Sequence, residues 1–395
     1  MKTLFTHFTL LTILSFAIWG CSSGSEDSSN PDPKPIPDPD PEVPEVAISF
    51  LKEGTEYMYD YNNGLEVLPI NMVVEKQLSK DTFLVRNYTE TPYVNPTIYW
   101  VLKDNMWYSS YRLRDPDFYQ VECKFGQPVG TSWTVTRGIY TSTYTIEAVD
   151  VTVKTGKGDV EDAIKLKIKD PFGDIEYSYV SPTVGPIGNG DYDPEGGESS
   201  LQLKDYTLGS LSKDENVLPA ITFGDFPFMK VGAYWKFSAE DISGKKSVYT
   251  QEIIGKVDGK NIYKVKLTNA EETVYSNWYE DNGLLMSYEE GETLVQADPI
   301  YMDASVAKPE YGWTGTAKNG SVFIYRIAEM NRKTNTFFGE LPCMLIDVTN
   351  FNTWQTNYWN QEKGHLSIDG IFLTSEVVSS NAKMEKRPFI PFLSL

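Results

Sequence analysis

The feature that most constrains the fold is a sequence pattern that occurs twice. Residues 50–59 read FLKEGTEYMY and residues 228–237 read FMKVGAYWKF, at an offset of 228 − 50 = 178. Three further matches follow in the same order, namely Asp104 with Asp281 (offset 177), Trp133 with Trp313 (offset 180) and the segment Tyr179 to Gly185 with Tyr358 to Gly364 (offset 179). Four matches in order at nearly one offset predict a tandem repeat.

The repeat divides the chain into successive parts. We expect a first unit over 46–209, a linker over 210–224 and a second unit over 225–395 that includes a C-terminal tail. The two units together are long enough for two domains of ordinary size. Lys383 to Arg387 is the longest basic cluster, and we expect the tail that contains it to pack on the second unit, with partner docking as the alternative.

Each unit has the composition of antiparallel β-structure. Short runs rich in Val, Ile, Thr and Tyr are separated by Gly, Asn and Asp, and Ile164 to Ile168 alternates strictly between apolar and polar residues. No convincing amphipathic helix of three turns is present. The sequence therefore predicts an all-β fold of two tandem antiparallel units, each a barrel or half-barrel, with a β-sandwich as the alternative.

Individual strands and turns can be predicted from the same pattern. Pairs that favour tight hairpins occur at Asn63-Gly64, Asp258-Gly259, Asn282-Gly283 and Asn319-Gly320. The predicted strands include Thr82 to Tyr88, Thr97 to Leu102, Thr143 to Val153, Val248 to Ile254, Ile262 to Leu267 and Val322 to Ile327.

The N-terminus resembles that of a bacterial lipoprotein. Lys2 precedes an apolar run from Leu4 to Trp19 that is too short for a stable transmembrane helix, and Gly20 stands directly before Cys21. This arrangement resembles a lipobox. The resemblance implies that residues 1–20 are a signal peptide and that Cys21 becomes the lipidated N-terminus, with an ordinary signal peptide as the alternative.

Residues 21–45 form a predicted tether, rich in Pro and Asp and without aromatic residues. Such a segment favours extended polyproline II structure and could hold the first unit up to about 70 Å from the lipid. The acidic residues after Cys21 resemble the export signals of Bacteroidetes-type lipoproteins, which implies a lipid anchor in the outer membrane and surface exposure. A periplasm-facing lipoprotein is the alternative.

The opening motif of each unit carries a second resemblance. Lys-x-Gly-x-x-aromatic-x-aromatic, beginning at Lys52 and at Lys230, is similar to the start of β-rich lipoprotein domains of Bacteroidetes-type bacteria. That family implies a β-rich fold and no settled activity.

Charge and cysteine content exclude some classes of function. Acidic residues exceed basic ones by 55 to 35, for a net charge of −20, so nucleic acid is not an expected partner. We expect Cys123 and Cys343 to be buried as small apolar residues and not joined in a disulfide.

Residue types needed for most enzyme mechanisms are scarce. After the predicted signal peptide His365 is the one histidine, and we expect it to be exposed in a turn. There is no zinc ligand pattern or phosphate-binding loop. We therefore expect no enzymatic activity and no cofactor, and a glycoside hydrolase with a pair of carboxylates is the alternative.

One acidic loop has the spacing of a cation site. Asp191, Asp193, Glu195 and Glu198 offer oxygen ligands at short intervals, as calcium loops do. Pro194 lies inside the loop and no helices flank it, so a solvated acidic loop is favoured over a weak calcium site.

Aromatic residues make up 13% of the chain, and they can either pack or bind. Aromatic rings fill β-barrel cores, which we favour, and they also stack on sugars and anchor protein interfaces. The candidate binding residues are Tyr99, Trp100, Trp107, Tyr108, Trp354 and Trp359. We expect a non-enzymatic binding or accessory module of the cell envelope with a glycan or protein partner, and a structural protein or a lipid carrier is the alternative.

Overall fold

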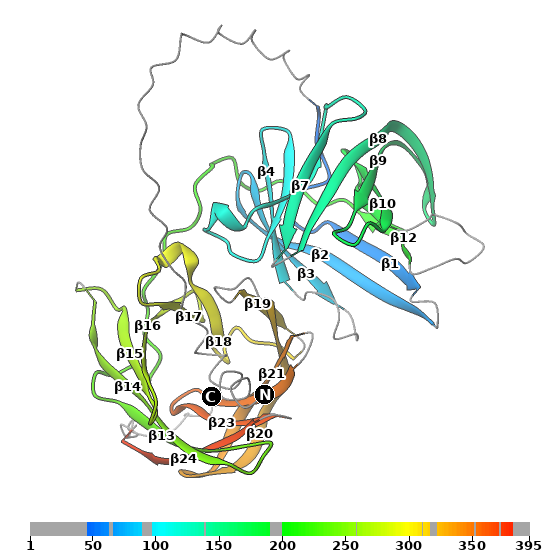
Figure 1. Ribbon diagram of the computed structural model, residues 1–395. Coiled ribbons are helices and arrows are strands. Elements are labelled where there is room, and N and C mark those ends of the chain that lie inside the picture. Colours follow the sequence, from blue (N-terminus) through cyan, green and yellow to red (C-terminus); the bar gives the residue numbers. More distant parts are fainter. Residues whose placement is uncertain are drawn as a thin grey trace, which may run out of the picture.

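The computed structural model contains two antiparallel β-sheets of 12 strands each, and each sheet curls into a nearly closed barrel (Figure 1). It describes residues 46–381 apart from 63–65, 89–96, 138–139, 190–199, 258, 310, 317–321, 351–352 and 371–372. Within these residues the helices are two 3-10 turns, Pro116–Phe118 and Leu294–Gln296. The predicted all-β barrel fold is confirmed. None of the helices in this part of the chain is long and apolar enough to cross a membrane.

The N-terminal barrel consists of the first twelve strands. They are β1 (Glu56–Asn62), β2 (Val67–Ser79), β3 (Thr82–Tyr88), β4 (Thr97–Lys103), β5 (Met106–Ser110), β6 (Gln120–Lys124), β7 (Ser132–Arg137), β8 (Tyr140–Thr155), β9 (Gly158–Lys169), β10 (Ile175–Ser181), β11 (Gly185–Asn189) and β12 (Ser200–Thr207).

The C-terminal barrel consists of the other twelve. They are β13 (Tyr234–Asp241), β14 (Lys246–Lys256), β15 (Tyr263–Thr268), β16 (Thr273–Asp281), β17 (Leu284–Glu289), β18 (Asp298–Met302), β19 (Gly312–Thr316), β20 (Val322–Thr336), β21 (Gly339–Asn350), β22 (Thr353–Asn360), β23 (Gly364–Gly370) and β24 (Leu373–Ser380). The predicted strands in both halves lie in or overlap these elements.

Both barrels have the same strand order. In the first, β1 pairs with β12, every other pair is consecutive in the chain, and the free edges are β6 and β7. In the second, β13 pairs with β24, and the free edges are β18 and β19. Each barrel is therefore an up-and-down meander whose one unpaired seam falls between two consecutive strands.

A tryptophan bridges this seam in each barrel. Trp133 on β7 donates its indole N–H to the carbonyl of Val121 on β6 at 2.9 Å, and Trp313 on β19 donates to the carbonyl of Pro299 on β18 at 2.6 Å. Trp133 also stacks on Tyr144 at 5.7 Å between ring centroids, and Trp313 stacks on Tyr325 at 5.5 Å. The match of Trp133 with Trp313 thus has a structural reason. In each barrel the indole supplies a hydrogen bond across the seam, where the backbone ladder between the two edge strands is missing.

Two other matches of the repeat meet each other inside the barrel. A Cβ at Gly185 would lie 2.7 Å from the ring of Phe50 and 2.7 Å from the hydroxyl of Tyr57. A Cβ at Gly364 would lie 3.1 Å from Trp235 and 3.2 Å from Phe228. The opening motif and the late Gly segment are therefore repeated together, because aromatic rings from the first pack on the bare backbone of the second.

The hairpin at Asn282-Gly283 is confirmed, since both residues have positive φ, 52° and 83°, as a type I′ turn requires. Its counterpart is Asp104-Asn105, with φ 52° and 56°. The turns are thus related by an offset of 282 − 104 = 178, and the predicted match of Asp104 with Asp281 is wrong by one residue. The corrected register matches Trp100 with Trp278. The other three predicted turn pairs lie at least partly outside the described residues.

Candidate functional site

Two of the predicted binding aromatics form the centre of the N-terminal barrel. Trp100 on β4 is 2% exposed and Trp107 on β5 is 6% exposed. Their rings meet edge to face at 5.0 Å, and Phe50 packs edge to face on Trp107 at 5.6 Å. Because β-strand side chains alternate between faces, these two point into the barrel and present no platform to solvent.

The other four predicted aromatics lie in different places. Trp359 is buried in the C-terminal barrel, where it stacks on Tyr301 at 4.8 Å. Tyr108 is half-buried and packs on Tyr119 at 6.0 Å. Trp354 is 44% exposed on β22. Tyr99 lies where the two barrels meet, so the six residues do not form one site.

The predicted lipidation and calcium residues cannot be placed. Cys21 and the acidic loop with Asp191, Asp193, Glu195 and Glu198 lie outside the described residues. Within the part of the chain that the structure describes, no group of three or more His, Cys, Asp or Glu side chains could hold a metal ion. Cys123 and Cys343 are buried free thiols, as predicted.

The predicted exposure of His365 is wrong. Gly364 begins β23, so His365 is a strand residue, and its side chain points inward and is 7% exposed. The imidazole stacks on Trp359 at 4.8 Å and lies 5.4 Å from Phe237. Its Nε2 has no hydrogen-bond partner among the described residues. Burial lowers the pKa of His365 to about 4, and this barrel core therefore contains a neutral imidazole at pH 7.

A cluster of charged and polar side chains lies at the junction of the two barrels, and the sequence did not reveal it. Arg112, in the loop after β5, donates from Nε and Nη2 to the two carboxylate oxygens of Asp298 on β18, at 3.0 Å and 2.9 Å. The side chain of Arg112 is 4% exposed and that of Asp298 is 17% exposed. The guanidinium also lies over the ring of Phe118 at 4.2 Å. This bidentate pair joins one barrel to the other.

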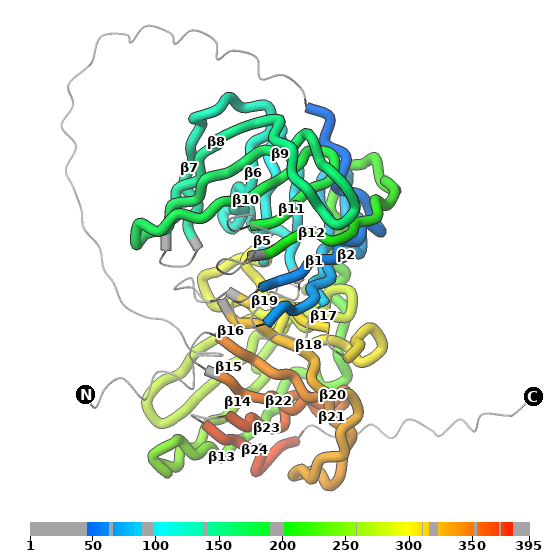
Figure 2. The backbone as a smooth tube through the Cα atoms, turned by 90° about the vertical axis from the view of Figure 1, so that its right-hand side faces the viewer, coloured from blue at the N-terminus to red at the C-terminus, as the bar shows by residue number. Residues whose placement is uncertain are grey.

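A second group at the junction surrounds Tyr311, which precedes β19. Its hydroxyl donates to Glu75 on β2 at 3.1 Å. Arg86 on β3 is paired with the same Glu75, lies over the Tyr311 ring at 4.2 Å and donates to the carbonyl of Gly312 at 3.3 Å. Tyr88 from the end of β3 packs against the core of the C-terminal barrel. Figure 2 shows the two barrels stacked on each other with β19 between them.

Tyr99 on β4 belongs to the same junction. Burial raises its pKa, and the charges that act on it come from both barrels, from Arg86 and Arg114 on one side and from Asp281 and Asp298 on the other. The junction therefore brings several ionisable groups together. Its two best-defined guanidinium groups are engaged by carboxylates, a carbonyl and aromatic rings, an arrangement suited to holding surfaces together rather than to binding a free anion.

One signal in the sequence could have pointed to the junction. Asp298 is paired with Ser287 in the ladder, and the equivalent position in the first barrel, paired with Ser109, is Gln120. Tyr311, whose carbonyl accepts from Ile327, corresponds in the same way to Thr131, whose carbonyl accepts from Ile146. Asp298 and Tyr311 are thus positions at which the two repeats differ.

No family model and no curated protein matches the chain. Among solved structures the chain is similar to a protein of unknown function from the DUF3598 family of Nostoc punctiforme, at 8% sequence identity, with 83% of this chain and 96% of that chain covered and a TM-score of 0.17. A TM-score this low supports no inference about fold or function.

Proposed function

We propose that this protein is a lipid-anchored cell-envelope lipoprotein of the Bacteroidetes type that binds a protein partner on the outer surface of its two barrels and catalyses no reaction. The lipobox at Cys21 and the Pro-Asp tether over 21–45 support the anchor and the reach. The resemblance of the acidic residues after Cys21 to export signals supports a place on the outer face of the outer membrane.

The observation that carries the choice of partner is the location of the large aromatic side chains. The largest fully buried side chains include Trp100, Tyr57 and Tyr59 in the core of the first barrel and Trp235 and Tyr301 in the core of the second. A lipid carrier would use an open apolar interior, and a glycan module would use a row of exposed flat rings. Aromatic packing inside the barrels favours neither of these, and it supports the proposal that a partner binds on the outer surface.

Binding to isolated cell envelopes of the source bacterium tests this proposal. The purified whole chain would be titrated onto untreated envelopes, onto envelopes treated with protease and onto envelopes whose sugars have been oxidised with periodate. We expect saturable binding that protease removes and periodate leaves intact. Loss of binding after periodate alone, or saturable binding on a glycan array, would contradict a protein partner.

Matched variants make the experiment specific. Trp354→Ala removes the most exposed of the six predicted aromatics, and we expect it to leave glycan-array signals at background. Cys21→Ala should abolish incorporation of labelled fatty acid and release the chain from the membrane fraction. A Cys21→Ala chain that still carries the label would contradict the predicted anchor.

A further inference from the structure

We propose that the two barrels form one rigid body, locked by the junction and by the linker, so that the chain presents both barrels to a partner at a fixed spacing. The fixed spacing of the barrels does not depend on which partner binds. It differs from the behaviour expected of two modules on a flexible string, in which each would bind by itself and gain only from effective concentration.

We call the contacts that hold the barrels together the lock: the Arg112–Asp298 pair, the group around Tyr311 and the bonds of the linker. The pair of Arg112 and Asp298 is its first part. Its geometry is bidentate, and each side chain is largely withdrawn from water. Arg112 also lies 3.6 Å from the carboxylate of Asp115 in its own barrel. Charges removed from water are stabilised only when they are paired in good geometry. Since Arg112 belongs to one barrel and Asp298 to the other, separating the barrels would break two charge-assisted hydrogen bonds at once.

The group around Tyr311 makes a second, independent attachment. Glu75 and Arg86 of the N-terminal barrel contact the hydroxyl, the ring and the following carbonyl of this one segment of the C-terminal barrel. Two attachments at different places restrict the rotation of one barrel on the other more than a single attachment would. The packing of Tyr88 on the second core adds apolar contact between them.

The linker is itself fastened to both barrels. On the first barrel, the fully buried Gln77 accepts from the backbone N–H groups of Ser212 and Lys213 at 2.7 Å and 3.0 Å. On the second, the N–H of Thr222 donates to the carboxylate of Asp281 at 3.1 Å, and the N–H of Gly224 donates to the carbonyl of Glu280 at 3.1 Å. A linker held at both ends by its own backbone gives the barrels little freedom to move apart.

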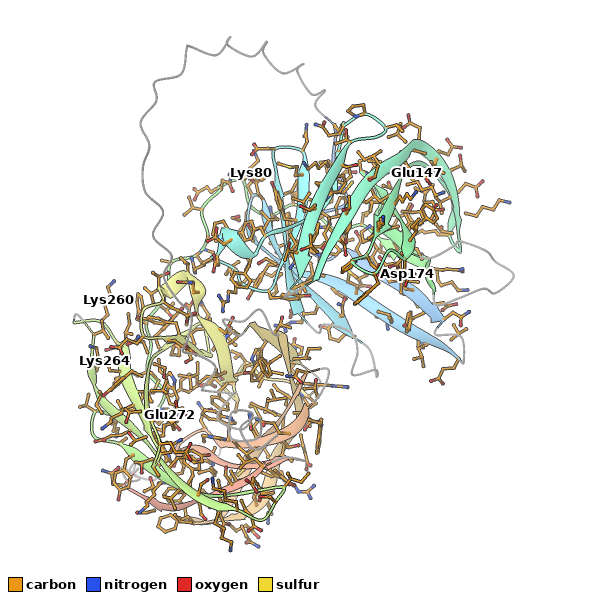
Figure 3. The ribbon with its side chains drawn as sticks, in the orientation of Figure 1. Lys80, Glu147, Asp174, Lys260, Lys264 and Glu272 are labelled. Carbon is orange, nitrogen blue, oxygen red and sulfur yellow. The ribbon has the colours of Figure 1, made fainter. Side chains whose placement is uncertain are left out.

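Distances between spin labels on the two barrels test the lock in the whole chain. Asp174 is exposed in the β9–β10 turn of the N-terminal barrel and Glu272 is exposed in the β15–β16 turn of the C-terminal barrel (Figure 3). Each would be replaced by a labelled cysteine. Cys123 and Cys343 are buried, and the chain without the introduced cysteines gives the background labelling. We expect one narrow distance peak.

Variants that keep the shape of the side chains separate the lock from folding. Asp298→Asn with Tyr311→Phe removes the charge and the hydroxyl at the junction, and Arg86→Met with Arg112→Met removes both guanidinium groups. We expect the narrow peak to be lost in each, with an unchanged far-ultraviolet circular dichroism spectrum. Asp241→Asn with Tyr234→Phe is the matched control, because both residues bond within the C-terminal barrel, and its peak should stay narrow.

Two outcomes would overturn the proposal. One is a broad or multiple distance distribution in the unmodified chain. The other is a narrow peak that persists in both junction variants, which would show that the contacts around Arg112 and Tyr311 do not hold the barrels together. Neither outcome bears on the binding of envelopes, so the failure of the lock and the failure of the proposed function are distinguishable.

Discussion

The two barrels are built with the same devices but differ where they touch. Both bridge the seam with a tryptophan, and both pack aromatic rings of the opening motif on a glycine with positive φ. At the junction, in contrast, Asp298 and Tyr311 of the second barrel stand where the first has Gln120 and Thr131. Residues that close a barrel are thus kept in both copies, whereas Asp298 and Tyr311, which join the second barrel to the first, occur in the second copy alone.

The interiors show the same division. Trp100 and Trp278 occupy equivalent places in the two barrels and are both buried. Pro186 follows Gly185 in the first barrel, whereas the buried His365 follows Gly364 in the second. The comparison teaches that the shared rings set the architecture, while single replacements give one barrel a titratable group or a contact that the other lacks.

The largest expected effect separates interior from surface aromatics. Trp100→Ala leaves a large cavity beside Trp107 and Phe50, and we expect it to lower the free energy of unfolding by about 4 kcal/mol. Trp354→Ala, at an exposed position, should change it by less than about 0.5 kcal/mol. Urea unfolding followed by tryptophan fluorescence measures both. Equal losses would contradict the assignment of these rings to core and surface.

The repeated glycine tests whether the same device is equally tight in both barrels. Gly185 has φ 99° and Gly364 has φ 78°, and an added Cβ meets closer atoms at Gly185. Strain at positive φ and overpacking should lower the free energy of unfolding by about 3 kcal/mol for Gly185→Ala and by about 2 kcal/mol for Gly364→Ala. Denaturant titrations of the two variants check the order, and a larger effect at Gly364 would reverse the comparison.

His365 should make the stability of the C-terminal barrel depend on pH. Its folded pKa of about 4 lies below the ordinary value of 6.5, because burial disfavours the charged form. Between these values the unfolded chain binds the proton and the folded chain does not, so the contribution is fully present above pH 6.5 and is lost as the pH falls towards 4. From pH 7 to pH 5 the free energy of unfolding should fall by about 2 kcal/mol from this group.

The control for that prediction is His365→Phe, which keeps an aromatic ring between Trp359 and Phe237. Unfolding of the wild type and of this variant would be measured across the same pH range. We expect the difference between the two curves to follow the titration of one imidazole. Parallel curves would mean that His365 takes up its proton equally in both states.

A smaller loss of stability is expected at the seam. Trp133→Phe keeps a ring to stack on Tyr144 but removes the indole N–H that reaches the carbonyl of Val121. Loss of one such hydrogen bond should lower the free energy of unfolding by about 1 kcal/mol, and Trp313→Phe should do the same in the other barrel. Hydrogen exchange along β6 and β7 would show whether the seam opens. No change in exchange there would argue against a closing role.

The fold could be predicted from the sequence because its signals are local or repeated. The alternation of Ile164 to Ile168, the Asn282-Gly283 turn and the constant offset each specify strands or their order. The location of the aromatic rings was harder to predict. A two-residue period shows that neighbouring side chains face opposite sides of the sheet, but it does not show which side is inside the barrel. The exposure of His365 was predicted wrongly for a related reason. Gly364 is the first residue of a strand, so His365 lies in that strand and not in an exposed turn.

The junction could not be predicted, because it depends on which outer faces of two finished barrels meet. Arg112 and Asp298 are far apart in the sequence, and each alone is ordinary for a charged surface. The comparison of the repeats distinguishes Asp298, because the first barrel has the uncharged Gln120 at the equivalent position.

Differential scanning calorimetry of the whole chain tests most directly whether the duplicated barrels act as one body. We predict a single unfolding transition whose calorimetric and van't Hoff enthalpies agree, and two separate transitions when Arg86→Met and Arg112→Met are combined. Two transitions in the unmodified protein would contradict the account, as would a single transition that the combined variant leaves unchanged.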